Sequence, residues 1–241
     1  MESQSTQKQN FISLTTSKRL LNDIKQIIKN PLDEHGIYYY HDESDMLKGY
    51  ALIIGPKDTL YEGGAYLFEF NFPTDYPYSP PLLRYKTNNG NTRFNPNLYK
   101  NSKVCVSILN TWSGEQWSSC QNISTILLVL VSLLNNTPLL NEPGINSRHR
   151  DFDSYHKSIQ FENLNYAVKK MIDPLYYPRG FKKLYEKYID YLKNGGFDIL
   201  INKIKALNKS ENKEELTVSL YGMKTMIDYE NLLKEFKKIK L

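Results

Sequence analysis

Cys105 is the side chain with the clearest potential for chemistry in this sequence of 241 residues. It follows Lys103 by two positions, and a nearby cation favours the thiolate form of a thiol. The thiolate is the reactive form of cysteine, whereas an unreactive free cysteine commonly serves as a small buried hydrophobic residue. The sequence therefore offers Cys105 as a candidate nucleophile, with a role in the core as the alternative.

Asn97 is the side chain that could assist this nucleophile, eight residues before it in the sequence. Pro96 fixes its own φ angle and biases Asn95 toward an extended backbone, so Asn97 can be held rigidly. Acyl transfer at sulfur needs a donor directed at the developing oxyanion, and an amide NH2 can supply one. This interpretation requires the sulfur of Cys105 to be accessible and to face the amide of Asn97.

Other kinds of site find little support in the sequence. The segment 55–58 lacks the glycine spacing and the Ser or Thr of a phosphate loop, and the motifs GxSxG, HExxH and GxGxxG are absent. His149 and His156 lie near two aspartates, but a structural role is more common than a metal site for such a pair. Two cysteines are too few for a disulfide framework or a four-thiolate zinc site. We expect no metal and no cofactor.

Composition and charge narrow the functional class. The chain has 40% hydrophobic and 24% charged residues, which are ordinary values for a globular protein and exclude wholesale disorder. Its longest apolar run, Ile123–Leu134, is shorter than the roughly 20 residues of a membrane span, and the polar N-terminus does not resemble a secretory signal. The net charge of +5 comes mostly from alternating charges near the C-terminus, typical of a solvated face and not of a nucleic-acid surface. Two free cysteines favour a cytoplasmic or nuclear location.

The elements that must position the two candidate residues begin with a helix that starts at Thr16 or Ser17 and stops before Pro31. Its apolar residues recur at the spacing of one helix face: Leu20, Leu21, Ile24, Ile27 and Ile28. The pattern then changes to the period of two that is typical of strands. It predicts four strands, at Gly36–Tyr40, Lys48–Ile54, Ala65–Phe72 and Leu82–Lys86. Their short connections predict an antiparallel meander.

Cys105 and Asn97 fall in the long segment Asn88–Trp117, which has turn residues throughout and no clear period. A loop of this length is usually functional or disordered, and its aliphatic side chains favour an ordered functional loop. The run Ile123–Leu134 predicts a helix buried in the centre of the domain. Further helices are predicted at Tyr155–Ile172 and, within an all-helical C-terminal part, at about 180–193, 197–208 and 226–240.

Seven landmarks in a fixed order give the sequence a family resemblance. They are Tyr61-Glu62-Gly63-Gly64, Phe72-Pro73, Tyr76-Pro77-Tyr78-Ser79-Pro80-Pro81, Phe94-Asn95-Pro96-Asn97, Lys103–Leu109, Trp117-Ser118 and the helix Ile123–Leu134. On these landmarks the chain resembles the ubiquitin-conjugating enzyme family over roughly residues 11–172. The longer loop Asn110–Gln116 and the C-terminal extension resemble the larger branch of that family. This branch includes the giant inhibitor-of-apoptosis conjugating enzyme and an enzyme that also accepts a second ubiquitin-like modifier.

The resemblance implies an α+β fold. Such a fold has an N-terminal helix, a four-stranded antiparallel meander, an active-site loop, a central helix and further helices at the C-terminus. Residues 1–10 would be a flexible tail, residues 11–172 the conjugating core domain, and residues 173–241 a helical C-terminal extension.

The resemblance also implies an activity and partners. Cys105 would accept ubiquitin or a ubiquitin-like modifier as a thioester from an activating enzyme, which consumes the ATP, and pass it to a lysine or a ligase. Asn97 would stabilise the oxyanion, and Glu142 is the candidate for deprotonating the attacking amine. Surface roles are implied for Lys18, Arg19 and Lys25 in docking the activating enzyme, for Tyr78 and Ser118 in binding a ligase, and for Leu128 and Ser132 in contacting the donor modifier.

Two departures from the family pattern bear on the site. Asn95 stands where the family usually has a histidine that holds the loop, and Ser119-Cys120 replaces the common Pro-Ala. Two alternatives also stay open. One is an interaction module with the conjugating fold but no catalysis, which the retained Cys105 and Asn97 oppose. The other is a cysteine hydrolase, which would need a histidine base beside Cys105.

Overall fold

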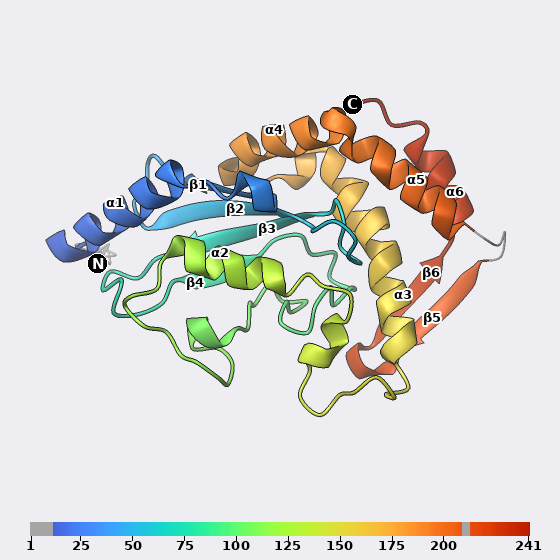
Figure 1. The fold of residues 1–241 in the computed structure, drawn as a ribbon, viewed down its shortest axis with the longest axis horizontal. Helices are drawn as coiled ribbons and strands as arrows, with labels where there is room; N and C mark the ends of the chain where they lie inside the picture. Colours follow the sequence, from blue (N-terminus) through green and yellow to red (C-terminus); the bar gives the residue numbers. More distant parts are fainter. Residues whose placement is uncertain (1–11, 209–212) are drawn as a thin grey trace, which may run out of the picture.

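The centre of the fold is a four-stranded antiparallel meander in the computed structural model, which describes residues 12–208 and 213–241. Its strands are β1 (Ile37–His41), β2 (Lys48–Ile54), β3 (Ala65–Asn71) and β4 (Leu82–Tyr85), in that spatial order (Figure 1). This confirms the strands and the topology predicted from the sequence. The tail predicted for residues 1–10 lies outside the described residues.

Helix α1 (Leu14–Lys29) leads into the sheet along one edge. The side chain of Ser13 caps it by accepting a hydrogen bond of 3.0 Å from the backbone N–H of Thr16, so the helix begins earlier than the sequence predicted. The hydroxyl of Thr16 instead donates to the carbonyl of Thr74 at 2.8 Å, which ties the helix to the loop after β3.

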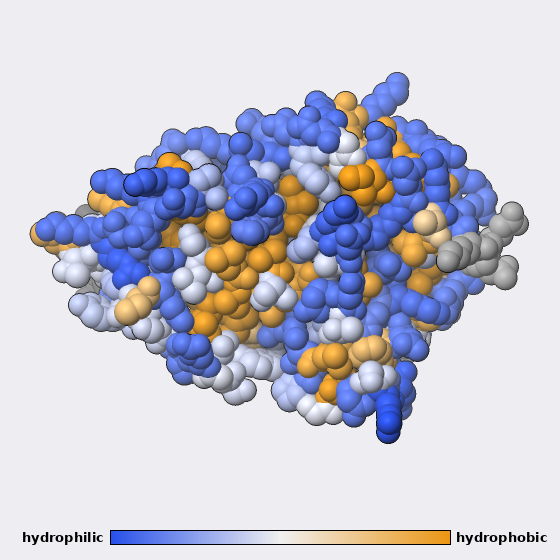
Figure 2. Space-filling view, viewed as in Figure 1, coloured by the Kyte–Doolittle hydropathy of each residue, from blue (hydrophilic) through white to orange (hydrophobic). Residues whose placement is uncertain are grey.

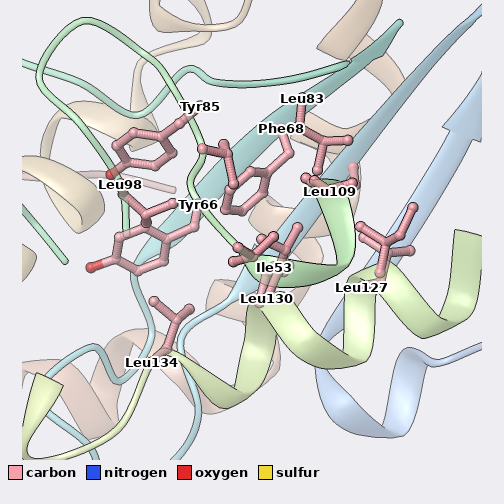
Figure 3. Packing of buried hydrophobic residues seen from close by; sticks show 14 of the residues in the cluster. Ile53, Tyr66, Phe68, Leu83, Tyr85, Leu98, Leu109, Leu127, Leu130 and Leu134 are labelled. Carbon is pink, nitrogen blue, oxygen red and sulfur yellow. The ribbon is translucent and has the colours of Figure 1, made fainter. Parts of the chain in front are cut away.

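One face of the sheet carries the main apolar cluster, which α2 (Ile123–Ser132) covers. Asn122 caps α2 by accepting from the N–H of Thr125 at 3.0 Å. Figure 3 shows Leu127 and Leu130 of this helix facing Ile53 and Phe68 of the sheet. Within the described ranges, no helix is long and apolar enough to cross a membrane.

The opposite face of the sheet is covered by the C-terminal half of the chain (Figure 1). The helices of this layer are α3 (Phe152–Glu162), which continues as a π-helical stretch to Val168, α4 (Lys182–Tyr191), α5 (Phe197–Leu207) and α6 (Tyr229–Phe236). Side chains alternate along β2, so Ala51 and Ile53 join the main cluster while Leu52 and Ile54 join this second cluster. The central strands are therefore apolar on both faces, and the C-terminal segment forms a layer of the fold.

A two-stranded hairpin interrupts this helical layer, and the prediction of an all-helical C-terminal part is wrong here. Strands β5 (Glu214–Val218) and β6 (Met223–Ile227) pair antiparallel across a turn that ends at Gly222, whose φ of 56° is left-handed. The buried residues alternate along β6, as expected for a strand with one covered face. The hairpin takes the start of the predicted helix 226–240, so α6 begins only at Tyr229.

The C-terminal layer is bonded to the glycine turn that precedes β3. Tyr188 of α4 donates to the carbonyl of Gly63 at 2.9 Å, and Lys203 of α5 forms an ion pair of 2.7 Å with Glu62. Leu200 packs so closely that a Cβ on Gly63 would lie 2.8 Å from its Cδ2, and Gly63 also has a left-handed φ of 71°. Both constraints require glycine at this position.

Truncating Leu200 should therefore destabilise the whole domain. Leu200 is fully buried, so Leu200→Ala is expected to lower the free energy of unfolding by about 2–5 kcal/mol. Its neighbour Ile199 is 48% exposed, and Ile199→Ala should change that free energy by less than about 0.5 kcal/mol. Urea unfolding of both variants measures the difference. Two equally small effects would show that the C-terminal layer does not fold with the sheet.

Candidate active site

Asn97 and Cys105 are directly paired through two hydrogen bonds. The N–H of Cys105 donates to the carbonyl of Asn97 at 2.9 Å, and the side-chain Nδ2 of Asn97 donates to the carbonyl of Cys105 at 2.6 Å. Leu98 bridges to Val104 as an antiparallel pair between them. The segment from Asn97 to Cys105 is therefore a closed loop whose two ends are the two candidate residues.

The amide of Asn97 keeps a donor free beside Cys105. Its Nδ2 carries two hydrogens, and the bond to the Cys105 carbonyl uses one of them. Its Oδ1 is buried and has no partner among the described residues. The amide is thus fixed at the backbone of the cysteine, and we expect its second N–H to be available to a group that approaches the sulfur.

Asn95 anchors this loop at three points. Its side chain is fully buried, and its Nδ2 donates to the carbonyl of Leu133 at 2.9 Å and to the hydroxyl of Tyr61 at 3.3 Å. Its Oδ1 accepts from the N–H of Asn97 at 2.9 Å. Buried amides need such partners, because an unpaired polar group in the core is costly. The asparagine at the usual histidine position therefore still ties the loop to the end of α2.

Cys105 is only 2% exposed, so the expectation of an accessible sulfur is wrong for this conformation. The residues on either side of it pack in the core. Val104 and Val106 belong to the main apolar cluster and Cys105 belongs to neither cluster of the described chain. Because successive side chains of an extended segment point to opposite faces, we expect the thiol of Cys105 to point to the face opposite Val104 and Val106.

The loop Asn110–Trp117 folds back over the segment that contains Cys105. The hydroxyl of Thr111 accepts from the N–H of Val106 at 3.0 Å and lies 3.1 Å from the carbonyls of Val104 and Val106. The indole N–H of Trp117 donates to the carbonyl of Pro77 at 2.7 Å, which fixes the far end of the loop. We therefore expect this loop to be the segment that covers the thiol of Cys105.

Glu142 lies in a polar cluster with residues of the C-terminal hairpin. Its Oε2 accepts a hydrogen bond of 2.5 Å from the hydroxyl of Tyr221. Burial, and secondarily the bond to Glu142, raise the pKa of the Tyr221 phenol, so it stays a protonated donor. No sequence pattern pointed to Tyr221, because it is 79 residues from Glu142 and belongs to no motif.

Residues 16–163 match the sequence model of the family described as "Ubiquitin-conjugating enzyme". This chain belongs to the ubiquitin-conjugating enzyme family. The match contains Asn97 and Cys105 and ends before α4, so the ubiquitin-conjugating core is followed here by segments that the family model does not describe.

Several curated relatives are similar to this family member. Ubiquitin-conjugating enzyme E2 Z of Xenopus tropicalis is 44% identical over 158 residues, covering 64% of this chain and 50% of that protein. The human protein of the same name is 45% identical over 158 residues, covering 64% of this chain and 44% of that protein. The human dual E2 ubiquitin-conjugating enzyme/E3 ubiquitin-protein ligase BIRC6 is 40% identical over 161 residues, covering 62% of this chain and 3% of that protein. The chain thus spans about half the length of the E2 Z relatives.

The family resemblance implies docking roles for three basic residues of α1. One of them is bonded within the protein, and the other two are exposed. Arg19 is engaged: its Nε lies 2.9 Å from Asp23, and its two terminal nitrogens donate to the carbonyls of Ser119 and Gln121 at 2.5 Å. It joins α1 to the loop before α2 and is not free for a partner. Lys18 and Lys25 are exposed on the same helix.

The other implied contact residues lie at the surface. Tyr78 is 74% exposed and Ser118 is exposed, although the proline cluster around Tyr78 could have buried it. Leu128 is 43% exposed on α2, and Ser132 of the same helix is also exposed. Figure 2 shows hydrophobic residues gathered over the position of α2. This helix therefore presents an apolar surface to solvent as well as to the core.

The histidines do not form a base for Cys105. His149 accepts at Nδ1 from the N–H of Asp151 at 3.2 Å, and the ring of His156 packs on Phe152 at a centroid distance of 4.3 Å. Burial lowers the pKa of His156, which keeps its ring neutral. Among residues 12–208 and 213–241, no histidine forms a hydrogen bond with Cys105, and no cluster of side chains is suited to a metal.

The covering loop should slow the reaction of Cys105 with a small alkylating reagent. In the native protein, exposed Cys120 is expected to react with iodoacetamide at least about tenfold faster than Cys105, which corresponds to an opening cost of about 1.4 kcal/mol. Peptide mass spectrometry measures both rates, and urea should remove the difference. Thr111→Val removes the hydroxyl but keeps the shape, so it should accelerate Cys105 and leave Cys120 unchanged. Equal native rates would contradict the burial.

Proposed function

We propose that this chain is a ubiquitin-conjugating enzyme that carries ubiquitin or a ubiquitin-like modifier as a thioester on Cys105. An activating enzyme would supply the modifier, and a lysine or a ligase cysteine would receive it. The observation that carries the proposal is the pairing of Asn97 with Cys105, which holds an amide donor beside the only thiol of the family's active-site motif. A reduced thiol is needed for this role, which favours the cytoplasm or the nucleus.

The first step is an exchange between two thiols. The Cys105 thiolate attacks the carbonyl carbon of the modifier's thioester on the activating enzyme, and the carbonyl oxygen becomes a tetrahedral oxyanion. When the oxyanion collapses, the new carbon–sulfur bond stays and the thiolate of the activating enzyme leaves. Attack of a good nucleophile on an activated acyl group needs no histidine base.

The second step transfers the acyl group to an amine. The lysine nitrogen attacks the same carbonyl carbon, loses one proton, and forms an amide as the Cys105 thiolate leaves. The free N–H of Asn97 would stabilise the oxyanion, because a fixed donor at the site of developing charge lowers the barrier without reorganisation. Glu142 is our candidate acceptor for the amine proton through a free lone pair of its carboxylate.

Both steps need the covering loop to move. A thioester carbonyl cannot reach a residue that is 2% exposed, so Cys105 has to be uncovered before it is charged. The hydroxyl of Thr111 and its backbone N–H, which donates to the carbonyl of Val106 at 3.4 Å, bond this loop to residues 104–106. These few hydrogen bonds are a small barrier to opening. We infer that an open form of the loop accepts the modifier.

The partners would use separate surfaces of the domain. Lys18 and Lys25 on α1 are proposed to dock the activating enzyme, without Arg19. Tyr78 and Ser118 are proposed to contact a ligase, and the exposed face of α2 at Leu128 and Ser132 is proposed to hold the donor modifier. We further propose that residues 11–172 act as the conjugating core and residues 173–241 as its extension.

A second candidate function is an interaction module that binds partners through the same fold without catalysis. The burial of Cys105 is the observation that favours it. The retained amide donor beside the cysteine favours the enzyme.

A charging assay separates these candidates. With an activating enzyme, ATP and a panel of ubiquitin-like modifiers, the chain should form an adduct that thiols cleave. Cys105→Ala should abolish the adduct, Cys105→Ser should give an oxyester that resists thiols, and Cys120→Ser should behave as the unchanged chain. If no modifier forms an adduct, the interaction module is the better description.

Removing the amide should separate the two steps. Asn97→Ala is expected to charge normally and to discharge to free lysine about 10²–10³-fold more slowly, as for the loss of other oxyanion donors. Single-turnover discharge after removal of ATP measures this rate. An equal loss of charging and discharge would show that Asn97 supports only the shape of the loop.

A further inference from the structure

The tip of the C-terminal hairpin lies against the segment that contains Asn97. Figure 1 shows β5 and β6 beside the start of α3. The N–H of Leu220 at the tip donates to buried Asp151 at 2.8 Å, and the amide of Asn91 donates to the carbonyl of Lys224 at 3.2 Å. The hairpin is therefore fixed on both sides of its turn, and Tyr221 is held between these bonds.

Tyr221 contacts the Asn95–Asn97 segment through Arg93. The guanidinium of Arg93 lies 3.4 Å from the ring centroid of Tyr99 and 5.0 Å from that of Tyr221. The same guanidinium donates to the carbonyl of Pro96 at 2.6 Å and to that of Asn95 at 3.3 Å. One charged group thus connects the aromatic tip of the hairpin to the two residues before the amide donor and to Tyr99, two residues after it.

A second cation strengthens this contact. The Nζ of Lys100 donates to the carbonyl of Tyr221 at 2.8 Å. Burial, together with the charge of Arg93, lowers the pKa of Lys100. The hydroxyl of Tyr221 also bonds an anion, because it donates to the carboxylate of Glu142 at 2.5 Å. Tyr221 is the residue that all three charged side chains share.

We propose that Tyr221 is a positioning residue for transfer of the modifier to lysine. Its hydroxyl fixes the Glu142 carboxylate, and its ring fixes Arg93 on the backbone of the Asn95–Asn97 segment. The inference rests on the proposed function, since it concerns the second step of that reaction. It assigns the C-terminal segment a part in the chemistry in addition to its part in the fold.

The contacts set this role apart from simple packing. Tyr177 offers a contrast, since its buried hydroxyl has no hydrogen-bond partner among the described residues. The hydroxyl of Tyr221 instead bonds the one carboxylate that the family resemblance assigns to the amine. Tyr221→Phe and Tyr177→Phe each remove one hydroxyl. Only Tyr221→Phe also removes a hydrogen bond, the one to Glu142.

The test compares Tyr221→Phe with Tyr177→Phe in the full chain. Each is charged with ubiquitin, ATP is removed, and discharge is followed over a range of free lysine concentrations. Tyr221→Phe should charge like the unchanged chain and discharge about tenfold more slowly, with the loss in the maximal rate and not in the half-saturating lysine concentration. Tyr177→Phe should match the unchanged chain in both steps.

A double variant tests whether the hydroxyl acts through Glu142. Tyr221→Phe combined with Glu142→Gln should discharge no more slowly than Glu142→Gln alone, because residues that act as one unit are not additive. Independent, multiplicative losses would overturn the inference.

The remaining outcomes are also decisive. Discharge of Tyr221→Phe at the rate of Tyr177→Phe would overturn the inference and leave the proposed function intact. So would an equal loss of charging and discharge accompanied by a lower urea midpoint, since that pattern reports packing alone. If the unchanged chain forms no thioester with any modifier, the proposed function fails and the inference fails with it.

Discussion

The two hydrogen bonds between Asn97 and Cys105 join the ends of a nine-residue loop, and the rest of the site is arranged around that pair. Asn95 anchors the first end to α2 through its buried amide. The alternation of an extended backbone then sends Val104 and Val106 into the core and the thiol to the other side. The position of the sulfur is therefore a consequence of core packing on either side of it.

A thiol that is buried by a loop can become exposed without disruption of the core. A thiol inside an apolar core could be exposed only by disrupting the core, at the large cost of separating packed side chains. A thiol beneath a surface loop can be uncovered by moving the loop alone, and loops are the segments of lowest local stability. The burial of Cys105 by the loop that Thr111 holds is thus compatible with a site that opens to a large acyl donor.

The C-terminal segment packs on the sheet and also contacts the residues around the site. Its helices cover the second face of the sheet, and Tyr188 and Leu200 hold the glycine turn at Gly63. Its hairpin sends Val218 and Met223 into the main apolar cluster and Tyr221 onto Arg93 and Glu142. A segment outside the matched family region is therefore part of both the core and the surroundings of the site.

Sequence alone determined the elements whose pattern is local. Periods of two and 3.6 residues identified β1 to β4, α1 and α2, and the order of short motifs identified the family and the candidate pair Asn97 and Cys105. Only the tertiary structure decided that the thiol is covered, that Arg19 is engaged internally and that Tyr221 reaches Glu142. It also decided that five-residue strands form a hairpin at 214–227, where a helical pattern was expected to begin. These features depend on contacts between segments far apart in the chain, and no local period records which distant side chain will supply a partner.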